Sequence, residues 1–566
     1  MIPERLTLKE LLKQSISQYG QLPFAAFVGE KGYSYTQYAL RIAAVQRFFA
    51  AKGVTKGDRI AILGENSPEW GICYLAVTTY GAVAVPLLTD FQSSEISSIL
   101  EHAQIQGICV SQRLEAKASQ ALQESKPNSP ADSTGKSRNE GFWRLRIDDL
   151  SEIDGQGSLV YSLYNEAEED ASADKEIEFP RTVQEEDPAA IIYTSGTTGA
   201  PKGVSLTHRN ITHNVVSTSY IPVKLRPGDR LLSILPLAHT YECTIGFLAP
   251  LLLGCCVYYL HSLPAPTVLM PALKSVQPHV ILSVPLLMEK LYRKMVLPKL
   301  EGSAALRLLH RFPPGRRLMH LMVGYKLRRI FGGKLKYFIV GGASLSPEVE
   351  RFLHEACFPL AKGYGLTETS PLIAGCTPAY DRLYSVGTPL QGISVSIDTP
   401  DPEQQPGEIL VKGPSVTPGY YREQERTQKA FDREEWFHTG DLGTMDRDGY
   451  LYINGRLKNL IVGPSGENIY PEEIETLLYE DEAVLEALVI EQQGRVIALV
   501  HPDYKLLKEK KREQVDEFLQ QLRKTVNSRL PAFSRLAELQ EQKEAFEKTP
   551  TNKIKRYIYT SASEET

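Results

Sequence analysis

Cysteine is scarce in this sequence. Seven cysteines occur among 566 residues, and no two of them have the CxxC spacing of a redox or zinc motif. Most lie in apolar stretches, as Cys255 and Cys256 do. The pattern excludes a disulfide-stapled secreted scaffold and predicts reduced, buried thiols in a cytoplasmic protein.

An export signal and long uninterrupted apolar runs are also lacking. The N-terminal MIPERLTLKELLKQ mixes acids and bases without an apolar core, so we do not expect secretion. The run from Gly71 to Thr89 is nearly long enough to span a bilayer, but Gly81 and Pro86 interrupt it. We interpret it as a buried helix, a glycine turn and a core strand.

No charge of one sign dominates. Lys and Arg total 63 against 68 Asp and Glu, so the formal net charge is -5, which argues against a chain-wide surface for nucleic acid. With 42% hydrophobic and 23% charged residues the composition is that of a globular protein, and the length predicts two or more domains.

Short strand-like runs alternate with longer amphipathic segments along most of the chain. The runs at 58–64, 81–87, 279–284 and 336–342 predict parallel strands joined by crossover helices. After about residue 455 come PEEIETLLYE, VLEALVIE, RVIALVH and a charged helix, enough for a compact unit. We therefore predict the α/β class, with a large N-terminal body of mixed and parallel sheets over 1–455 and a small α+β C-terminal domain over 456–566, joined by a hinge.

Two segments of the body differ from the rest. Residues 125–188 are polar and then acidic, which predicts a surface insertion, either a solvated acidic face or a docking site for a basic partner.

Residues 290–336 hold 13 Lys or Arg residues opposed only by Glu301. Apolar residues interleave with these bases and Pro313, Pro314 and Gly315 interrupt them, which predicts two short amphipathic helices. Such helices either rest on anionic lipid or pack on the body with their charges in water.

A glycine-rich loop is the first motif that indicates a binding site for phosphate. The sequence YTSGTTGAPKG over 193–203 combines hydroxyls, three glycines and one lysine. Glycines let backbone N–H groups approach phosphate oxygens, while hydroxyls and a lysine add donors and charge. The lysine follows a proline and precedes a glycine, so the spacing is not that of a P-loop.

Further motifs follow at intervals along nearly the whole chain: PLAHTYE, KGYGLTETS, WFHTGDLG, GRLKNLIV and TPTNKIKR. Together with the loop, they resemble in order and spacing the adenylate-forming enzymes, which include acyl-CoA synthetases, aryl-CoA ligases, peptide-synthetase adenylation domains and beetle luciferases. GENIYPEEIE, the TPT before the last motif lysine and the basic insertion are most similar to the long-chain fatty acyl-CoA synthetase branch.

The resemblance implies a reaction. A long-chain fatty acid would be activated by ATP through an acyl-AMP intermediate and transferred to the thiol of coenzyme A, with AMP and pyrophosphate released and Mg²⁺ as the metal. It implies a cytoplasmic enzyme, peripheral at the inner face of the membrane if residues 290–336 contact anionic lipid.

The resemblance also implies roles for particular residues. Lys553 would be the catalytic lysine, His239 would line the junction of acyl group and phosphate or else be a core side chain, and Lys458 would lie at the interdomain hinge. Glu368, with Thr194 or Thr367, would hold Mg²⁺. Thr194 would also help in catalysis, and the nucleotide would be bound by Ser195, Gly196, Thr197, Thr198, Gly199, Lys202, Gly342, Ala343, Tyr364, Gly365, Thr367, Asp441 and Arg456.

Relatives rotate the C-terminal domain between the two half-reactions, which would withdraw Lys553 and turn the region from Asn459 to Tyr470 toward the adenylate. Two positions depart from the family pattern. Asn552 stands where many members have glycine, and Lys362 stands where an acid or amide commonly opens the adenine motif.

Three other functions stay open. An acyl-acyl carrier protein synthetase would use the same adenylate, and an acidic carrier would suit the basic segment. A luciferase-type oxygenase would share the adenylation residues. A scaffold without activity is disfavoured because Lys202, Glu368, Asp441 and Lys553 are all present.

Overall fold

The computed structural model describes residues 3–125, 142–154, 157–163, 177, 179, 181–194, 202–221, 224–463, 467–509, 515–548 and 554–560. Much of the predicted insertion near 125–188 therefore lies outside the described residues. The described chain forms two compact units. We call Met1–Thr194, Pro201–Ser394 and Val411–Phe437 the N-terminal unit, and Val395–Leu410 and His438–Thr566 the C-terminal unit. The predicted domain limits 1–455 and 456–566 stay a prediction.

The N-terminal unit contains a first nine-stranded sheet, which we call sheet A. Its central strands run parallel, and β2, β16 and β17 are antiparallel at the two edges. Their order is β17 (Thr388–Pro389), β16 (Leu372–Cys376), β15 (Leu360–Gly365), β14 (Tyr337–Val340), β13 (Val280–Ser283), β11 (Arg230–Leu232), β12 (Cys256–Tyr259), β1 (Pro23–Phe27) and β2 (Tyr33–Ser34).

A second nine-stranded sheet, sheet B, combines a parallel centre with antiparallel hairpins at both ends. The order is β20 (Gly419–Tyr420), β10 (Lys202–Thr207), β9 (Pro188–Thr194), β4 (Val83–Leu87), β3 (Arg59–Leu63), β5 (Gly107–Val110), β6 (Trp143–Arg146), β7 (Ser151–Ile153) and β8 (Leu159–Ser162). The two sheets confirm the predicted α/β body of mixed and parallel sheets.

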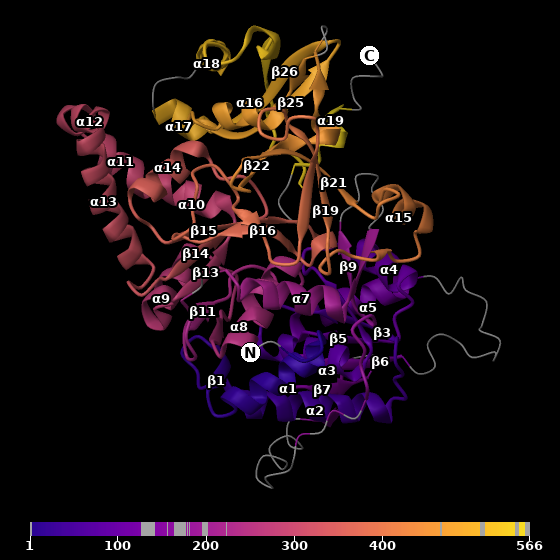
Figure 1. The fold of residues 1–566 in the computed structure, drawn as a ribbon. Coiled ribbons are helices and arrows are strands. Elements are labelled where there is room, and N and C mark those ends of the chain that lie inside the picture. Colours follow the sequence, from indigo (N-terminus) through magenta and orange to yellow (C-terminus); the bar gives the residue numbers. More distant parts are fainter. Residues whose placement is uncertain are drawn as a thin grey trace. The chain divides into compact units, whose positions relative to one another are not determined.

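Crossover helices connect these strands, and α1, α2 and α3 pack against one another (Figure 1). The helices are α1 (Leu8–Tyr19), α2 (Tyr35–Ala51), α3 (Pro68–Tyr80), α4 (Ser93–His102), α5 (Glu115–Glu124), α7 (His208–Thr218), α8 (Ala249–Leu253), α9 (Pro266–Val276), α10 (Pro285–Leu291), α11 (Leu297–Glu301), α12 (Ala304–Arg311), α13 (Pro313–Ile330), α14 (Pro347–Glu355) and α15 (Gln424–Ala430).

The apolar run from Gly71 to Thr89 shows why these segments fold as they do. Ser67 caps α3, every residue of α3 is buried, and Gly81 ends it with φ +90°. Only glycine adopts this conformation at little cost, so the chain can turn directly into β4. The prediction of a buried helix, a glycine turn and a core strand is confirmed. In the described part of the chain, no helix combines the length and apolarity that crossing a membrane requires.

Two helices, α12 and α13, are present in the basic segment, but α13 has 18 residues and is not the short helix that was predicted. Pro313 and Pro314 begin α13, where a missing N–H costs nothing. The inner side of α13 packs through Met319 and Leu327 on a core that includes Phe338 and Phe352 of sheet A and α14.

The C-terminal unit is a smaller α+β assembly. Its strands form a four-stranded sheet, a two-stranded ribbon and a three-stranded sheet: β18 (Ser394–Asp398), β19 (Gly407–Lys412), β21 (Phe437–Met445) and β22 (Leu451–Arg456); β23 (Ile461–Val462) and β24 (Asn468–Ile469); and β25 (Val484–Gln492), β26 (Arg495–Pro502) and β27 (Glu538–Glu541). Its helices are α16 (Pro471–Leu478), α17 (Tyr504–Glu509), α18 (Val515–Asn527) and α19 (Arg556–Thr560). Buried residues of α16, α18 and the three-stranded sheet share one core, as the predicted α+β unit requires.

Candidate active site

The hairpin of β9 and β10 holds the two ends of the glycine-rich loop. Thr194 ends β9, Lys202 begins β10, and the two residues are direct partners in the antiparallel register. The loop residues between them, 195–201, lie outside the described residues, and so do the predicted phosphate contacts Ser195, Gly196, Thr197, Thr198 and Gly199. The ladder nevertheless fixes where the loop leaves sheet B and where it returns.

Lys202, Glu368 and Tyr420 form a polar cluster at this end of the hairpin. Lys202 Nζ lies 2.7 Å from Glu368 Oε1 and 3.5 Å from the hydroxyl of Tyr420. The Tyr420 hydroxyl donates to the same Glu368 oxygen over 3.0 Å. Strand β20 brings Tyr420 here because it pairs with β10 in sheet B. Three segments far apart in sequence thus converge on one carboxylate.

The electrostatics of the cluster keep Glu368 ionised. Burial alone would raise the pKa of this carboxyl, but the charge and hydrogen bond of Lys202, with further hydrogen bonds from the backbone and Tyr420, lower it below 4.5. For Tyr420, burial and the adjacent Glu368 charge raise the pKa above 10. At neutral pH the cluster therefore holds one carboxylate and one neutral phenol beside the Lys202 side chain.

The turn that carries Glu368 is held by a buried side chain. Thr367 and Glu368 lie in a short 3₁₀ turn, Thr367–Thr369, between β15 and β16. Asn214 of α7 donates to the carbonyls of Thr369 and Leu372 over 3.1 and 2.8 Å. Because these are buried backbone groups, the amide fixes the turn and with it the direction of the carboxylate.

The predicted adenine residues gather at the carboxyl edge of sheet A. Val340 of β14 is the register partner of Lys362 of β15, so Gly342 and Tyr364 follow two residues beyond an adjacent pair. Gly342 has φ +84°, and Ala343 after it is exposed. At Gly365 a Cβ atom would lie 1.8 Å from the Pro371 carbonyl oxygen, so this position requires glycine.

Lys362, the departure from the family pattern, is a buried ion-pair residue. Its ammonium lies 2.6 Å from Glu350 and 2.8 Å from Asp381, and it donates to the Arg382 carbonyl over 3.1 Å. Burial lowers the pKa of Lys362, but the charges of neighbouring Cys376, Glu350 and Asp381 outweigh burial and raise it above 10.5. The acid or amide expected at this position is replaced by a lysine with two carboxylate partners.

His239 lies where the chain enters the π-helix Glu242–Leu248, a rare local geometry. Its carbonyl accepts the Cys243 N–H over 2.9 Å, and the side chain is partly exposed. Beside it, a cavity of about 10 Å³ is walled mainly by apolar side chains, among them Ile192, Leu206 and Leu237. These walls belong to sheet B and to the segment that carries His239.

In the C-terminal unit, Asp441 and Arg456 are cross-strand partners of β21 and β22. Arg456 Nε lies 2.8 Å from Asp441 Oδ1; the carboxylate is buried and the guanidinium is half exposed. Glu408 supports the same strand, β21, since it accepts the Gly440 N–H over 2.9 Å and lies 2.8 Å from His438 Nδ1. The arginine therefore orients a buried carboxylate rather than facing the solvent alone.

Of the two predicted lysines of the C-terminal unit, Lys458 is among the described residues and Lys553 is not. Lys458 is exposed in the short turn Leu457–Asn459 that follows β22. Lys553 lies outside the described residues. The residues on either side of its segment are placed, because Lys548 and Ile554 form an antiparallel bridge. That bridge brings the chain back onto the C-terminal unit directly after Lys553.

The residues near the hairpin fit a Mg²⁺ ion. Within the part of the chain that the structure describes, the buried Oγ1 of Thr194 has no hydrogen-bond partner. Together with the ionised Glu368 it offers the oxygen ligands that this hard cation prefers. No group of three or more His, Cys, Asp or Glu side chains among the described residues could hold a metal, and Mg²⁺ bound with substrate phosphates does not need one.

Sequence reasoning missed Tyr420, Asn214, Glu408 and His438. Tyr420 lies in the run TPGYY, in which a glycine and two aromatic residues after a proline were a usable signal. His438 stands in the motif WFHTGDLG, which was a usable signal as well. Asn214 and Glu408 act through backbone groups or neighbouring side chains, and single polar residues of this kind carry no sequence pattern.

Comparison with known proteins identifies the family of the chain. The protein-family description "AMP-binding enzyme" matches residues 12–421, and "AMP-binding enzyme C-terminal domain" matches residues 458–563. Over 485 residues the chain is 30% identical to the long-chain-fatty-acid–CoA ligase FadD15 of Mycobacterium bovis, covering 80% of this chain and 74% of that protein. It is 29% identical over 522 residues to the long-chain-fatty-acid–[acyl-carrier-protein] ligase AEE15 of Arabidopsis thaliana, covering 79% and 69%.

Two solved structures share the fold. ATP-bound MatB from Rhodopseudomonas palustris superimposes with a TM-score of 0.76 at 24% identity, over 99% of both chains. The o-succinylbenzoate CoA synthetase MenE from Bacillus subtilis, in complex with its acyl-adenylate, superimposes with a TM-score of 0.71 at 24% identity, over 96% of both chains.

Proposed function

The chain belongs to the AMP-binding enzyme family, and we propose that it activates a long-chain fatty acid with ATP and transfers the acyl group to coenzyme A, releasing AMP and pyrophosphate. The observation that carries the proposal is the pair of Lys202 and Glu368, 2.7 Å apart where the glycine-rich loop meets sheet B. The identity to long-chain-fatty-acid–CoA ligases supports the choice of substrate.

The chemistry explains why such a cluster is needed. A carboxylate resists nucleophiles because it is negatively charged and its oxygen is a poor leaving group. Attack of the carboxylate on the α-phosphorus of ATP forms an acyl phosphate anhydride and expels pyrophosphate, which places new negative charge on phosphate oxygens. Fixed positive groups and N–H donors stabilise that charge in the transition state.

The residues of the N-terminal unit divide these tasks. Lys202 supplies the ammonium for the β and γ phosphates at the end of the loop. Glu368 and Thr194 would hold Mg²⁺, which supplies charge neutralisation on the phosphates when bound. Tyr420 donates to Glu368 and fixes the carboxylate toward the hairpin.

The nucleoside would be bound by the residues at the carboxyl edge of sheet A. Tyr364 would stack on adenine, with Gly342, Ala343 and Gly365 leaving room for the base close to the backbone. Asp441 would accept hydrogen bonds from the ribose hydroxyls, and its pairing with Arg456 keeps the carboxylate oriented.

The second half-reaction needs different geometry. The thiol of coenzyme A must reach the carbon that Lys553 approaches during adenylation, so both cannot occupy that position at once. Rotation about Lys458 would withdraw Lys553 and present Asn459–Tyr470 to the adenylate. The acyl chain would enter beside His239, where the apolar walls of the small cavity would have to separate.

The acyl carrier protein is the alternative acceptor. One relative of comparable identity is named as a long-chain-fatty-acid–[acyl-carrier-protein] ligase. A carrier protein presents the same pantetheine thiol as coenzyme A, so the adenylation residues do not distinguish the two.

Pyrophosphate release with fatty acids of graded chain length tests the proposal, with coenzyme A and carrier protein supplied separately. We expect acid-dependent release that is fastest with long chains and thioester formation with coenzyme A. Thioester formation with carrier protein alone would establish the alternative. Absence of acid-dependent pyrophosphate would refute both.

A variant separates the half-reactions. Lys553→Ala should depress adenylation by roughly 100-fold or more while leaving thioester formation from preformed acyl-AMP nearly unchanged. The matched control is Lys543→Ala, an exposed lysine of the same unit. Equal losses in the two steps would contradict the rotating C-terminal domain.

A further inference from the structure

Helix α13 has two apolar faces, and only one of them is covered. The inner face is buried through Met319 and Leu327. On the outer face Leu318, Met322 and Tyr325 are 57%, 53% and 64% exposed. Their spacing of four and then three residues places them in one stripe along the helix. An exposed apolar stripe of this length marks a contact surface.

The neighbouring helix α12, which packs on α13, adds exposed apolar residues. Leu308 and the following Phe312 are 58% and 59% exposed. The helix is tied to α13 by a hydrogen bond of 3.0 Å between the Nε2 atoms of His310 and His320. In Figure 1, α12 and α13 lie at the outer edge of the N-terminal unit, beyond α14.

The segment that carries the stripe is rich in basic residues and has no acidic ones. Between Glu301 and Glu348 the sequence has nine Lys or Arg residues and no Asp or Glu. Within the described chain, Arg316 and Lys336 pair with carboxylates of other segments. The exposed bases of α12 and α13 with no carboxylate partner among the described residues are Arg307, Arg311, Arg317, Lys326, Arg328 and Arg329.

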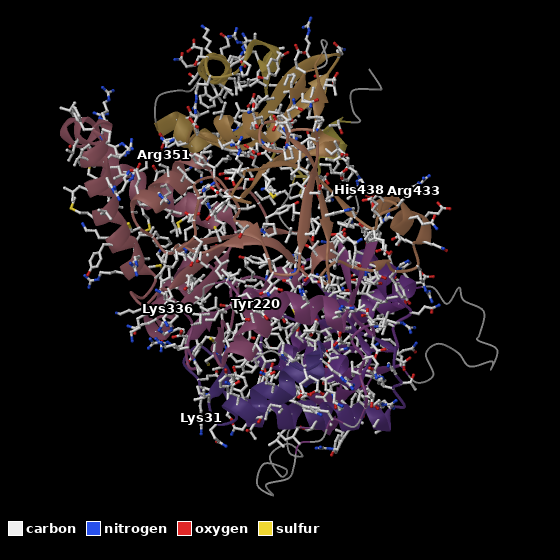
Figure 2. The ribbon with its side chains drawn as sticks, in the orientation of Figure 1. Lys31, Tyr220, Lys336, Arg351, Arg433 and His438 are labelled. Atoms are coloured by element: carbon white, nitrogen blue, oxygen red, sulfur yellow. The ribbon has the colours of Figure 1, made fainter. Side chains whose placement is uncertain are left out.

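A basic depression continues this surface at the C-terminal end of α13. Its volume is about 730 Å³, and Arg328 belongs both to the helix and to its wall. Lys336, which Figure 2 labels near the lower end of α13, also belongs to the wall. The other basic residues of the wall are Lys224, Arg226 and Lys334. A cavity walled by this many cations suits a phosphate group.

We propose that the outer face of α12 and α13, with this depression, docks on an anionic lipid bilayer. Leucine, methionine and aromatic side chains would enter the interface, while the long basic side chains flank them and reach the headgroup phosphates. A bilayer matches the surface because it offers negative charge and hydrocarbon together over the whole length of α13. A folded acidic protein would leave the projecting stripe of Leu318, Met322 and Tyr325 against polar groups.

The first test is binding of the full-length protein to vesicles, which requires no turnover and so is independent of the proposed function. Sedimentation with phosphatidylcholine vesicles containing about 30% phosphatidylglycerol should recover the protein, and phosphatidylcholine alone should not. Raising salt from about 0.1 M to about 0.5 M should weaken binding strongly.

Charge variants make the test specific. The triple variant Arg317→Gln, Lys326→Gln, Arg329→Gln should lower the partition coefficient roughly 100-fold, at about 1 kcal/mol per base. The matched control Lys31→Gln, Lys429→Gln, Arg433→Gln removes three exposed bases elsewhere in the unit, two of them labelled in Figure 2. It should bind as the unaltered protein does.

Apolar variants test the second component. Leu318→Gln, Met322→Gln, Tyr325→Gln should lose at least 10-fold in partitioning, whereas Leu159→Gln, Leu263→Gln, Tyr380→Gln, at similarly exposed positions, should not. Both α13 variants should keep the thermal transition and turnover of a water-soluble acid.

Three results would overturn the proposal. The first is equal binding of the α13 variants and their controls to vesicles. The second is vesicle binding that does not depend on the phosphatidylglycerol content. The third is binding of an acidic carrier protein that the charge variant loses, although the same variant still binds vesicles. The last result would assign the surface to a protein partner.

Discussion

Arg556 of α19 donates to both carboxylate oxygens of Glu475 in α16, over 2.6 Å to Oε1. Its other terminal nitrogen donates to the Val489 carbonyl over 3.1 Å. Arg556 follows Lys553 by three residues, and Ile554 between them is bridged to Lys548. The pair therefore anchors the segment that carries the proposed catalytic lysine to the core of the C-terminal unit.

Loss of this anchor should affect one half-reaction. Arg556→Ala is expected to slow adenylation roughly 10- to 100-fold because Lys553 is no longer held in place. Thioester formation from preformed acyl-AMP should stay within about twofold, since this step does not use Lys553. Pyrophosphate release and single-turnover thioester assays measure the two steps. Lys555→Ala, whose ammonium has a 3.6 Å pair with exposed Glu547, is the control. Equal slowing of both steps would mean that Arg556 only stabilises the fold.

The cluster at the hairpin gives a graded prediction. Lys202→Met should lower kcat/KM for ATP roughly 100-fold, because the phosphate charge loses its ammonium. Tyr420→Phe removes one hydrogen bond to Glu368 and should cost roughly 10-fold or less. Initial rates at varied ATP concentration measure both. A larger effect of Tyr420→Phe than of Lys202→Met would contradict the assigned roles.

The pH dependence of this cluster follows from Glu368. Its pKa is lowered, so its favourable interactions stabilise the fold above pH 4.5 and are lost as pH falls through the lower folded pKa. Glu368 therefore stays ionised at neutral pH. An acid limb of ATP binding near pH 6 that vanished in Glu368→Gln would contradict this.

Lys362 makes a prediction about stability rather than nucleotide binding. Lys362→Met leaves Glu350 and Asp381 buried without their cation and should cost roughly 3–5 kcal/mol of unfolding free energy. The pKa of Lys362 is raised, so the pair is intact below pH 10.5 and is lost only as pH rises through the folded value. Urea unfolding measures the loss. The exposed pair of Lys412 with Glu435 supplies the control Lys412→Met, expected to cost about 1 kcal/mol or less.

Glu242 gives a pH dependence opposite in sign to that of Glu368. Burial raises the pKa of this carboxyl to about 8, against the lowering effect of the 2.6 Å hydrogen bond from Ser233. An unfolded chain releases that proton near pH 4.5, so between pH 4.5 and 8 the folded state binds the extra proton and stability falls as pH rises, by about 1.4 kcal/mol per pH unit. Glu242→Gln should remove this slope. Unfolding free energies at about pH 6 and pH 8 measure it, and an unchanged slope would refute the assignment.

The sequence predicted the fold class because the evidence for it is local. The runs at 58–64 and 81–87 are strands β3 and β4, parallel neighbours as expected. The alternation of apolar and basic residues and the prolines of the basic segment predicted α12 and α13. Motif order placed Lys202 and Glu368 in one site, although 166 residues separate them.

The supporting contacts could not be predicted in the same way. Asn214, Tyr420 and Glu350 act through partners that only the packed sheets bring near, and nothing in their local sequence names those partners. Lys362 illustrates the limit. The sequence shows a lysine where relatives carry an acid or amide, but the two carboxylates that accommodate it come from α14 and a loop.

The pairing of Thr194 with Lys202 has a consequence for how the loop can vary. One residue inserted within 195–201 would lengthen the loop and leave the lysine at its place in the ladder. The same insertion inside β10 would shift the strand by one step and turn each later side chain to the opposite side of sheet B. Tolerance to added length should therefore change abruptly at Lys202, because beyond it the side of sheet B that each side chain faces depends on the even or odd count of residues along the strand.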